Sequence, residues 1–340
     1  MYSRFNGISR RDLLKLPAAT AIAATGACGY RKVREPPARA GVYRVKSYGE
    51  PISDVIGRAL SQFPEVIRRA QGGTVVLKPN LVEYYDSWRV NTHPAVVAGA
   101  ITAFRAAGAK EVIVAEGPGH CRDMELLLEQ SDLEHAIRSE RSRFVDLNLD
   151  SIRPVRLPSN YTKLNEISYS QTLLGANLIV SLPKLKTHHW AGVTLSLKNM
   201  FGTVPGARYG WPKNILHWRG IENSIVDINV SLKPHFAIVD GIEGMEGDGP
   251  LRGETVNAGV LVVGDNLTAV DATAARVMGL FPERVKHLQM MVKHGGTISE
   301  DNISQIGETI AQVRRDFRVL EDFQYLKQAP TWFTNFIDAI

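Results

Sequence analysis

Strand candidates alternate in this chain with segments of helical periodicity. The strand candidates lie at residues 42–45, 74–77, 111–115, 144–147, 155–157, 166–168, 178–182, 235–239 and 258–263, and several contain unbroken apolar runs, such as residues 75–77, 112–115 and 258–263. Helical spacing occurs at residues 52–70, 94–107, 124–139, 214–232 and 267–278. Unbroken apolar strands that alternate with helices are typical of a parallel sheet covered on both faces. The sequence therefore predicts an α/β fold with a largely parallel sheet and a site at the carboxyl ends of its strands.

The N-terminus has the composition of an export signal. Arg10 and Arg11 precede a weakly apolar, uncharged stretch at residues 16–27, as in twin-arginine signals. This stretch is shorter than the roughly 20 residues of a membrane-spanning helix. We expect export by the twin-arginine machinery to the periplasm or to the extracytoplasmic face of the membrane. An ordinary basic helix start is the alternative.

Two outcomes are open at the end of the signal. Cys28 follows a degenerate lipobox in which Thr25 replaces the usual aliphatic residue, so Cys28 is a candidate for lipidation. Ordinary cleavage near Ala23 or Ala27 is the other outcome. We expect contact with the membrane only through the signal or such an anchor.

These features divide the chain into four parts. We expect a signal at residues 1–29, a charged, proline-bearing linker at 30–41, an α/β domain at 42–327 and an aromatic tail at 328–340. Within the domain, Pro64 is expected to kink or divide its helix. Residues 189–210 are expected to be rich in loops.

Charge and cysteine content argue against a nucleic-acid partner, a disulfide framework and a cysteine-ligated iron–sulfur cluster. The formal net charge is +5, but residues 1–29 hold four basic residues and one acidic residue, so only +2 remains beyond them. With no basic run there, nucleic acid is not an expected partner. The two cysteines, Cys28 and Cys121, are too few for a disulfide framework or a cysteine-ligated iron–sulfur cluster.

Ionisable and amide side chains follow the ends of four predicted strands. Because ligands bind at the carboxyl ends of such strands, we expect these side chains to converge on one site. They are Lys78, Asn80, His93, Glu116, Lys184, Lys186, His188 and Asp240.

The lysines suggest an anionic ligand. Lys184 and Lys186 alternate on an extended segment and can face the same side. With Lys78 and Lys198 they could clamp a phosphate or carboxylate, while Asn80, Asn199 and His93 contact the ligand. The alternative is that these lysines are solvated rims of separate loops.

His188 is the preferred candidate for proton transfer or metal ligation, because adjacent His189 would point to the opposite face. Glu116 and Asp240 are the candidate acidic partners, and a divalent metal would use His188 with Asp240. No spacing motif requires the metal, and the cofactor stays undefined.

Residues 241–250 contain four glycines and three carboxylates. Glycine allows backbone amides to approach a ligand closely, so we expect residues 244–250 to close over it, with Gly247 and Gly249 in contact. The segment matches neither a Walker loop nor a Rossmann fingerprint. A flexible acidic surface loop is the alternative.

Six ordered motifs resemble the bacterial and archaeal family known as domain of unknown function 362. They are residues 76–80 (VLKPN), 92–94 (THP), 183–188 (PKLKTH), 196–202 (SLKNMFG), 239–250 (VDGIEGMEGDGP) and 269–272 (AVDA). The resemblance spans residues 75–279. Many relatives carry a ferredoxin-type module with cysteine motifs, which this chain lacks. The resemblance implies a shared site and no particular reaction.

Together these features favour an exported enzyme that acts on a small anion, with metal assistance as an open option. In this hypothesis His188, Asp240 and Glu116 are catalytic, and hydrolysis, isomerisation and redox chemistry all stay open. One alternative is a non-catalytic anion- or cofactor-binding protein. Another is an accessory subunit that docks on a redox partner protein through residues 328–340.

Overall fold

The computed structural model describes residues 35–83 and 89–330, so the predicted signal, Cys28 and residues 331–340 of the tail lie outside the described residues. Its strands are β1 (Ala38–Arg44), β2 (Thr74–Pro79), β3 (Glu111–Glu116), β4 (Arg143–Asp146), β5 (Ile152–Arg156), β6 (Glu166–Ser170), β7 (Leu178–Leu182), β8 (Lys184–His188), β9 (Gly192–Thr194), β10 (Phe236–Glu246), β11 (Glu254–Gly264) and β12 (Ile303–Gly307).

The α-helices are α1 (Ile52–Leu60), α2 (Pro64–Ala70), α3 (Pro94–Ala106), α4 (Met124–Gln130), α5 (Leu133–Ser139), α6 (Gln171–Leu174), α7 (Ser196–Asn199), α8 (Gly206–Tyr209), α9 (Asn214–Trp218), α10 (Ile221–Leu232), α11 (Leu267–Val277), α12 (Lys286–Val292) and α13 (Ile310–Val313). A 3₁₀ turn, η2 (Met200–Thr203), extends α7. No helix in the described part of the chain is long and apolar enough to span a membrane.

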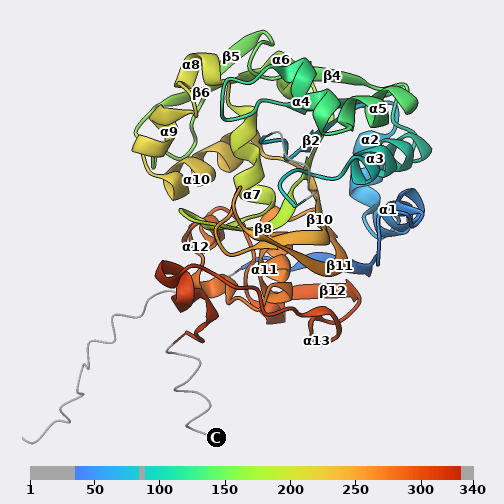
Figure 1. Cartoon of the computed structure of the whole chain (residues 1–340). Helices are drawn as coiled ribbons and strands as arrows, with labels where there is room; N and C mark the ends of the chain where they lie inside the picture. The colour runs from blue at the N-terminus through green and yellow to red at the C-terminus, as the bar shows by residue number, and fades with distance from the viewer. Residues whose placement is uncertain (1–34, 84–88, 331–340) are drawn as a thin grey trace, which may run out of the picture. The chain divides into compact units, whose positions relative to one another are not determined.

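The central sheet is largely parallel, as predicted. Its strand order is β12-β1-β11-β10-β7-β2-β3-β4, and β8 and β9 branch from β10. β7, β2, β3 and β4 pair in parallel, as do β10 and β7, whereas β11 runs antiparallel to both its neighbours. The carboxyl ends of β2, β3, β7 and β10 therefore point the same way (Figure 1).

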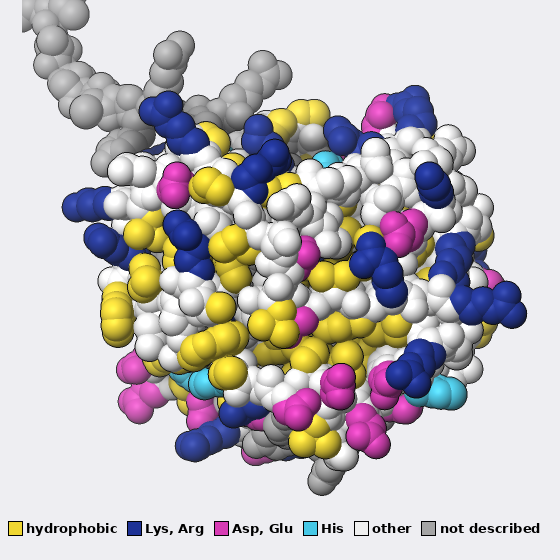
Figure 2. Space-filling model, turned by 90° about the horizontal axis from the view of Figure 1, so that it is seen from above, with side chains coloured by type: hydrophobic (Ala, Val, Ile, Leu, Met, Phe, Trp, Pro, Cys, Tyr) yellow, Lys and Arg dark blue, Asp and Glu magenta, His cyan; other side chains and the backbone are white. Residues whose placement is uncertain are grey.

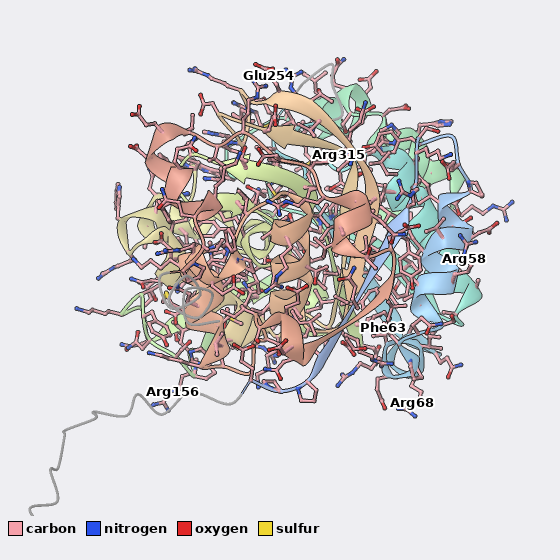
Figure 3. All side chains as sticks on the ribbon, turned by 90° about the horizontal axis from the view of Figure 1, so that it is seen from below. Arg58, Phe63, Arg68, Arg156, Glu254 and Arg315 are labelled. Carbon is pink, nitrogen blue, oxygen red and sulfur yellow. The ribbon has the colours of Figure 1, made fainter. Side chains whose placement is uncertain are left out.

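Helices cover both faces of this sheet, because side chains alternate along its strands. Val75 and Leu77 of β2 pack in a cluster with α1 to α5, whereas Val76 packs in a second cluster with α7 and α10 to α12. Phe63, next to α2, is fully buried. Its ring contacts that of Phe236 in β10 edge-to-face, with the ring centroids 5.2 Å apart. Arg58 of α1 lies further out than Phe63 in Figure 3.

Three predicted helices are divided, each for a local reason. Residues 124–139 form α4 and α5, because Asp132 between them has φ 56°, in the left-handed region. Pro64 begins α2 and separates it from α1, as expected from its missing N–H. Residues 214–232 form α9 and α10 rather than one helix, because Gly220 between them has φ +94°. That backbone conformation favours glycine and ends the first helix.

Two predicted boundaries are wrong. β1 begins at Ala38, so residues 38–41 belong to the sheet and not to the linker. β10 continues to Glu246 and pairs with β11, so residues 241–246 are strand and not loop. Glycine serves close packing there: a Cβ on Gly244 would lie 2.6 Å from the Leu185 carbonyl oxygen.

Candidate functional site

A cavity of about 260 Å³ lies at the carboxyl ends of β2 and β3. β8, α7, η2 and the segment around α9 complete its wall. The described residues place four lysines on this wall, Lys78, Lys186, Lys198 and Lys213, and a single carboxylate, Glu116. The cavity therefore has an excess of cationic side chains.

Lys78 and Glu116 form an ion pair at the floor of the cavity. Lys78 Nζ donates to Glu116 Oε2 at 2.5 Å and to Asn199 Oδ1 at 2.9 Å, and both charged side chains are almost fully buried. Leu81 N–H and Gly117 N–H also donate to the Glu116 carboxylate. Burial lowers the pKa of Lys78, and the Glu116 charge opposes that shift. Glu116 thus acts as the partner of Lys78.

The other three lysines have no ion pair with a carboxylate in the described part of the chain. Lys186 Nζ donates to the Val90 carbonyl at 2.8 Å, and Lys213 Nζ donates to the Gly117 carbonyl at 2.7 Å. Lys198 Nζ lies 4.7 Å from the centre of the Phe201 ring.

Burial of these three cations disfavours their charged forms. It lowers the pKa of Lys213 to about 7 and that of Lys198 to about 8, and it lowers the pKa of Lys186 well below its usual range. Neighbouring lysines add to each shift. On the face seen in Figure 2, by contrast, Lys and Arg side chains are dispersed among acidic ones. An anion in the cavity would offset the cost of gathering these charges.

His188 lines the cavity as a neutral ring. Its Nδ1 accepts from Trp190 N–H at 3.0 Å and from Ala191 N–H at 3.3 Å, so the proton of the neutral ring is on Nε2. Burial and nearby Lys198 hold the pKa of His188 well below its usual range. This side chain is therefore set up to donate a hydrogen bond from Nε2 rather than to accept a proton at Nδ1.

Two buried polar atoms in the wall lack a partner among the described residues. They are Asn80 Oδ1 and Thr194 Oγ1, and the two residues are 9% and 4% exposed. Buried polar groups are nearly always hydrogen-bonded, so such groups facing a cavity point to a polar ligand.

Asp271 of α11 holds the start of α7, the helix that carries Lys198 and Asn199. It accepts from Ser196 N–H at 2.7 Å, from Ser196 Oγ at 2.5 Å and from Leu197 N–H at 2.9 Å. Its side chain is fully buried, and burial raises its pKa to about 7. Asp271 therefore positions the cavity without lining it.

Lys184, Asp240 and His93 lie in a second cluster, away from the cavity wall. Lys184 Nζ donates to Asp240 Oδ2 and to Tyr48 Oη, both at 2.8 Å, and neither Lys184 nor Asp240 is exposed. The backbone N–H of His93 donates to Asp240 Oδ2. The His93 ring stacks on the Tyr48 ring, with the two ring centroids 3.6 Å apart. Their predicted roles in one site with His188 are thus not supported by their positions.

The predicted metal pair is not assembled either. His188 lines the cavity whereas Asp240 is bonded to Lys184, and no group of three His, Cys, Asp or Glu in residues 35–83 and 89–330 is placed to hold a metal ion. Nor do Gly247 and Gly249 line the cavity. Gly249 packs against the Thr187 backbone, and its neighbour Pro250 reaches the wall instead.

The prediction from sequence missed Lys213, His217 and Trp190, which all line the cavity. The first two belong to the segment around α9, which follows no strand, so the strand-end rule could not find them. Asp271 lies in the AVDA motif at residues 269–272, and this motif was the sequence feature that could have pointed to a role for Asp271.

Comparison with known proteins supports the resemblance drawn from the motifs. A family model described as "Domain of unknown function (DUF362)" matches residues 75–276. The chain belongs to this family. The DUF362 match includes the cavity lysines Lys78, Lys186, Lys198 and Lys213.

Individual relatives of this DUF362 protein are distant. It is 26% identical over 232 residues to a thylakoid-associated protein of Synechocystis sp.. The alignment covers 63% of this chain and 65% of the relative, so the chain spans less than two thirds of the relative's length. Among solved structures, it resembles the lactate racemase apoprotein of Thermoanaerobacterium thermosaccharolyticum (12% identity, TM-score 0.42) and a Thermotoga maritima protein (13%, 0.39). Each alignment covers 72% of this chain and 58% of the other.

Proposed function

We propose that this DUF362 protein is an exported enzyme that acts on a small phosphate- or carboxylate-bearing anion held in the lysine-lined cavity. The observation that carries the proposal is the charge imbalance of the wall, where four lysines face one carboxylate. Buried charges without partners are costly, and an anionic ligand would supply the missing partner. In this proposal residues 1–29 direct export through the twin-arginine route.

The chemistry follows from the groups on the wall. Lys186 and Lys213 would bind acidic oxygens of the substrate, because Lys78 already donates to Glu116, Asn199 and the Pro79 carbonyl. The preorganised positive charge would stabilise negative charge that develops during the reaction. His188 would donate its Nε2 proton in a hydrogen bond to a substrate oxygen. Lys198 has a pKa near 8 and no hydrogen-bond partner among the described residues, so it is the group best suited to exchange a proton near neutral pH.

Replacing His188 with alanine tests whether the site is catalytic. Alanine removes the imidazole Nε2–H donor, which would stabilise negative charge that develops on a substrate oxygen during the reaction. We expect H188A to bind phosphate within about tenfold of the wild type, because one hydrogen bond is lost, and to lose turnover by about 100-fold or more. Turnover can be followed by ¹H and ³¹P NMR in a defined mixture of phosphate monoesters and carboxylic acids.

The same experiment separates an enzyme from a binding protein. Wild-type protein that binds members of the mixture but converts none of them would contradict the catalytic role and favour a binding protein. His135→Ala is the matched control, since His135 of α5 is exposed and does not line the cavity. We expect H135A to retain both binding and turnover.

A further inference from the structure

A second hollow of about 380 Å³ adjoins the lysine cavity. It is lined by Trp190, Pro212, Asn214, His217, Trp218 and Ile221. Three of these residues, Trp190, Pro212 and His217, also line the cavity, so the two spaces share a wall. Among the residues that the structure describes, the second hollow contributes no lysine or carboxylate of its own.

Two tryptophans flank this hollow and are unusually exposed. Trp190 is 57% exposed and Trp218 is 79% exposed, although both are large apolar side chains. Aromatic rings continue from there into the cavity: the Trp190 and His217 rings are 5.4 Å apart, and the His217 and Phe201 rings 5.0 Å. Apolar surface of this kind beside a polar site is typical of a ligand groove.

The inner end of this aromatic row is cationic. Lys198 Nζ lies over the Phe201 ring, and Lys213 Nζ donates to the Phe201 carbonyl at 3.2 Å. A molecule that spans both spaces would meet positive charge at one end and tryptophan at the other.

We propose that the ligand is an amphipathic anion, with its acidic group among the cavity lysines and an apolar or aromatic group between Trp190 and Trp218. This inference rests on the proposed function, because it extends the ligand of the same cavity. It names the substrate class as acids with a sizeable apolar substituent rather than small polar metabolites.

Titration with inorganic phosphate and with phenyl phosphate tests the proposal. The two probes share the acidic group and differ by an aromatic ring. We expect the wild type to bind phenyl phosphate about tenfold more tightly or better, because the ring leaves water for an apolar groove. Trp218→Ala should abolish most of this preference and leave the affinity for inorganic phosphate unchanged, since Trp218 lines only the second hollow.

Leu149→Ala is the matched control, because Leu149 is 81% exposed and lies outside both spaces. A wild-type protein without the preference, or a W218A variant that keeps it, would overturn the proposal while leaving the anion site standing. Failure to bind either probe would overturn the proposed function as well. Binding of phosphatidylcholine vesicles that W218A abolishes, with the phenyl preference intact, would assign the tryptophans to a membrane instead.

Discussion

Replacing Gly202 with alanine is expected to destabilise this protein by about 3 kcal/mol or more, in the range seen when a buried ion pair is disrupted. A Cβ at this position would overlap Glu116 Oε1 and lie 2.5 Å from Lys78 Nζ. Both atoms are buried and hydrogen-bonded, so neither can move aside without losing a partner. The free energy of unfolding in guanidinium chloride measures the effect.

The affinity for phosphate should fall in the same variant, because the ion pair holds Lys78 in the cavity wall. Gly57→Ala is the control: a Cβ on Gly57 of α1 meets nothing within 4 Å, and alanine is the better helix former. We expect G57A to equal the wild type or to exceed it by up to about 1 kcal/mol. Equal stability of G202A and G57A would show that the ion pair is not packed as described.

Replacing Lys198 with methionine is expected to weaken anion binding without lowering the free energy of unfolding. The affinity for sulfate should fall about tenfold or more, because one of the cations around the ligand is lost. The free energy of unfolding without ligand should stay level or rise, because methionine fills a similar volume and removes a charge that has no ion pair among the described residues.

Lys46→Met is the control for the change in net charge, since Lys46 is exposed and does not line the cavity. We expect K46M to bind sulfate as the wild type does. Loss of stability in K198M together with unchanged sulfate affinity would mean that Lys198 is structural, and the anion site would lose its main support.

The sheet could be predicted from sequence because its strands are read from local patterns. Runs such as Leu178–Leu182 are buried at every position, as a strand covered on both faces requires. The segment at residues 241–246 could not be read this way. Its glycines indicate a turn by composition, and only the close approach of β8 in the fold explains them.

The candidate site was predicted in part, and the error at Lys184 has a structural cause. Lys184 and Lys186 are two residues apart on β8, which predicts one shared environment. The pairing of β8 with β10 is irregular between Asp240 and Met245, so the two lysines meet different neighbours. Lys184 pairs with Asp240, and Lys186 lines the cavity. Such a register shift depends on tertiary packing and leaves no local signal.

A titration of inorganic sulfate into the wild-type protein, followed by calorimetry at several pH values, tests the central claim most directly. Sulfate keeps its charge across this range, so only the protein titrates. Lys213 and Lys198 have pKa values of about 7 and 8, so both are charged at lower pH and lose their charge as pH rises through those values. We therefore predict saturable binding to one site at about pH 6.5 and affinity at least about tenfold weaker at about pH 9. Absence of saturable binding, or an affinity that does not change with pH, would contradict an anion site formed by these lysines.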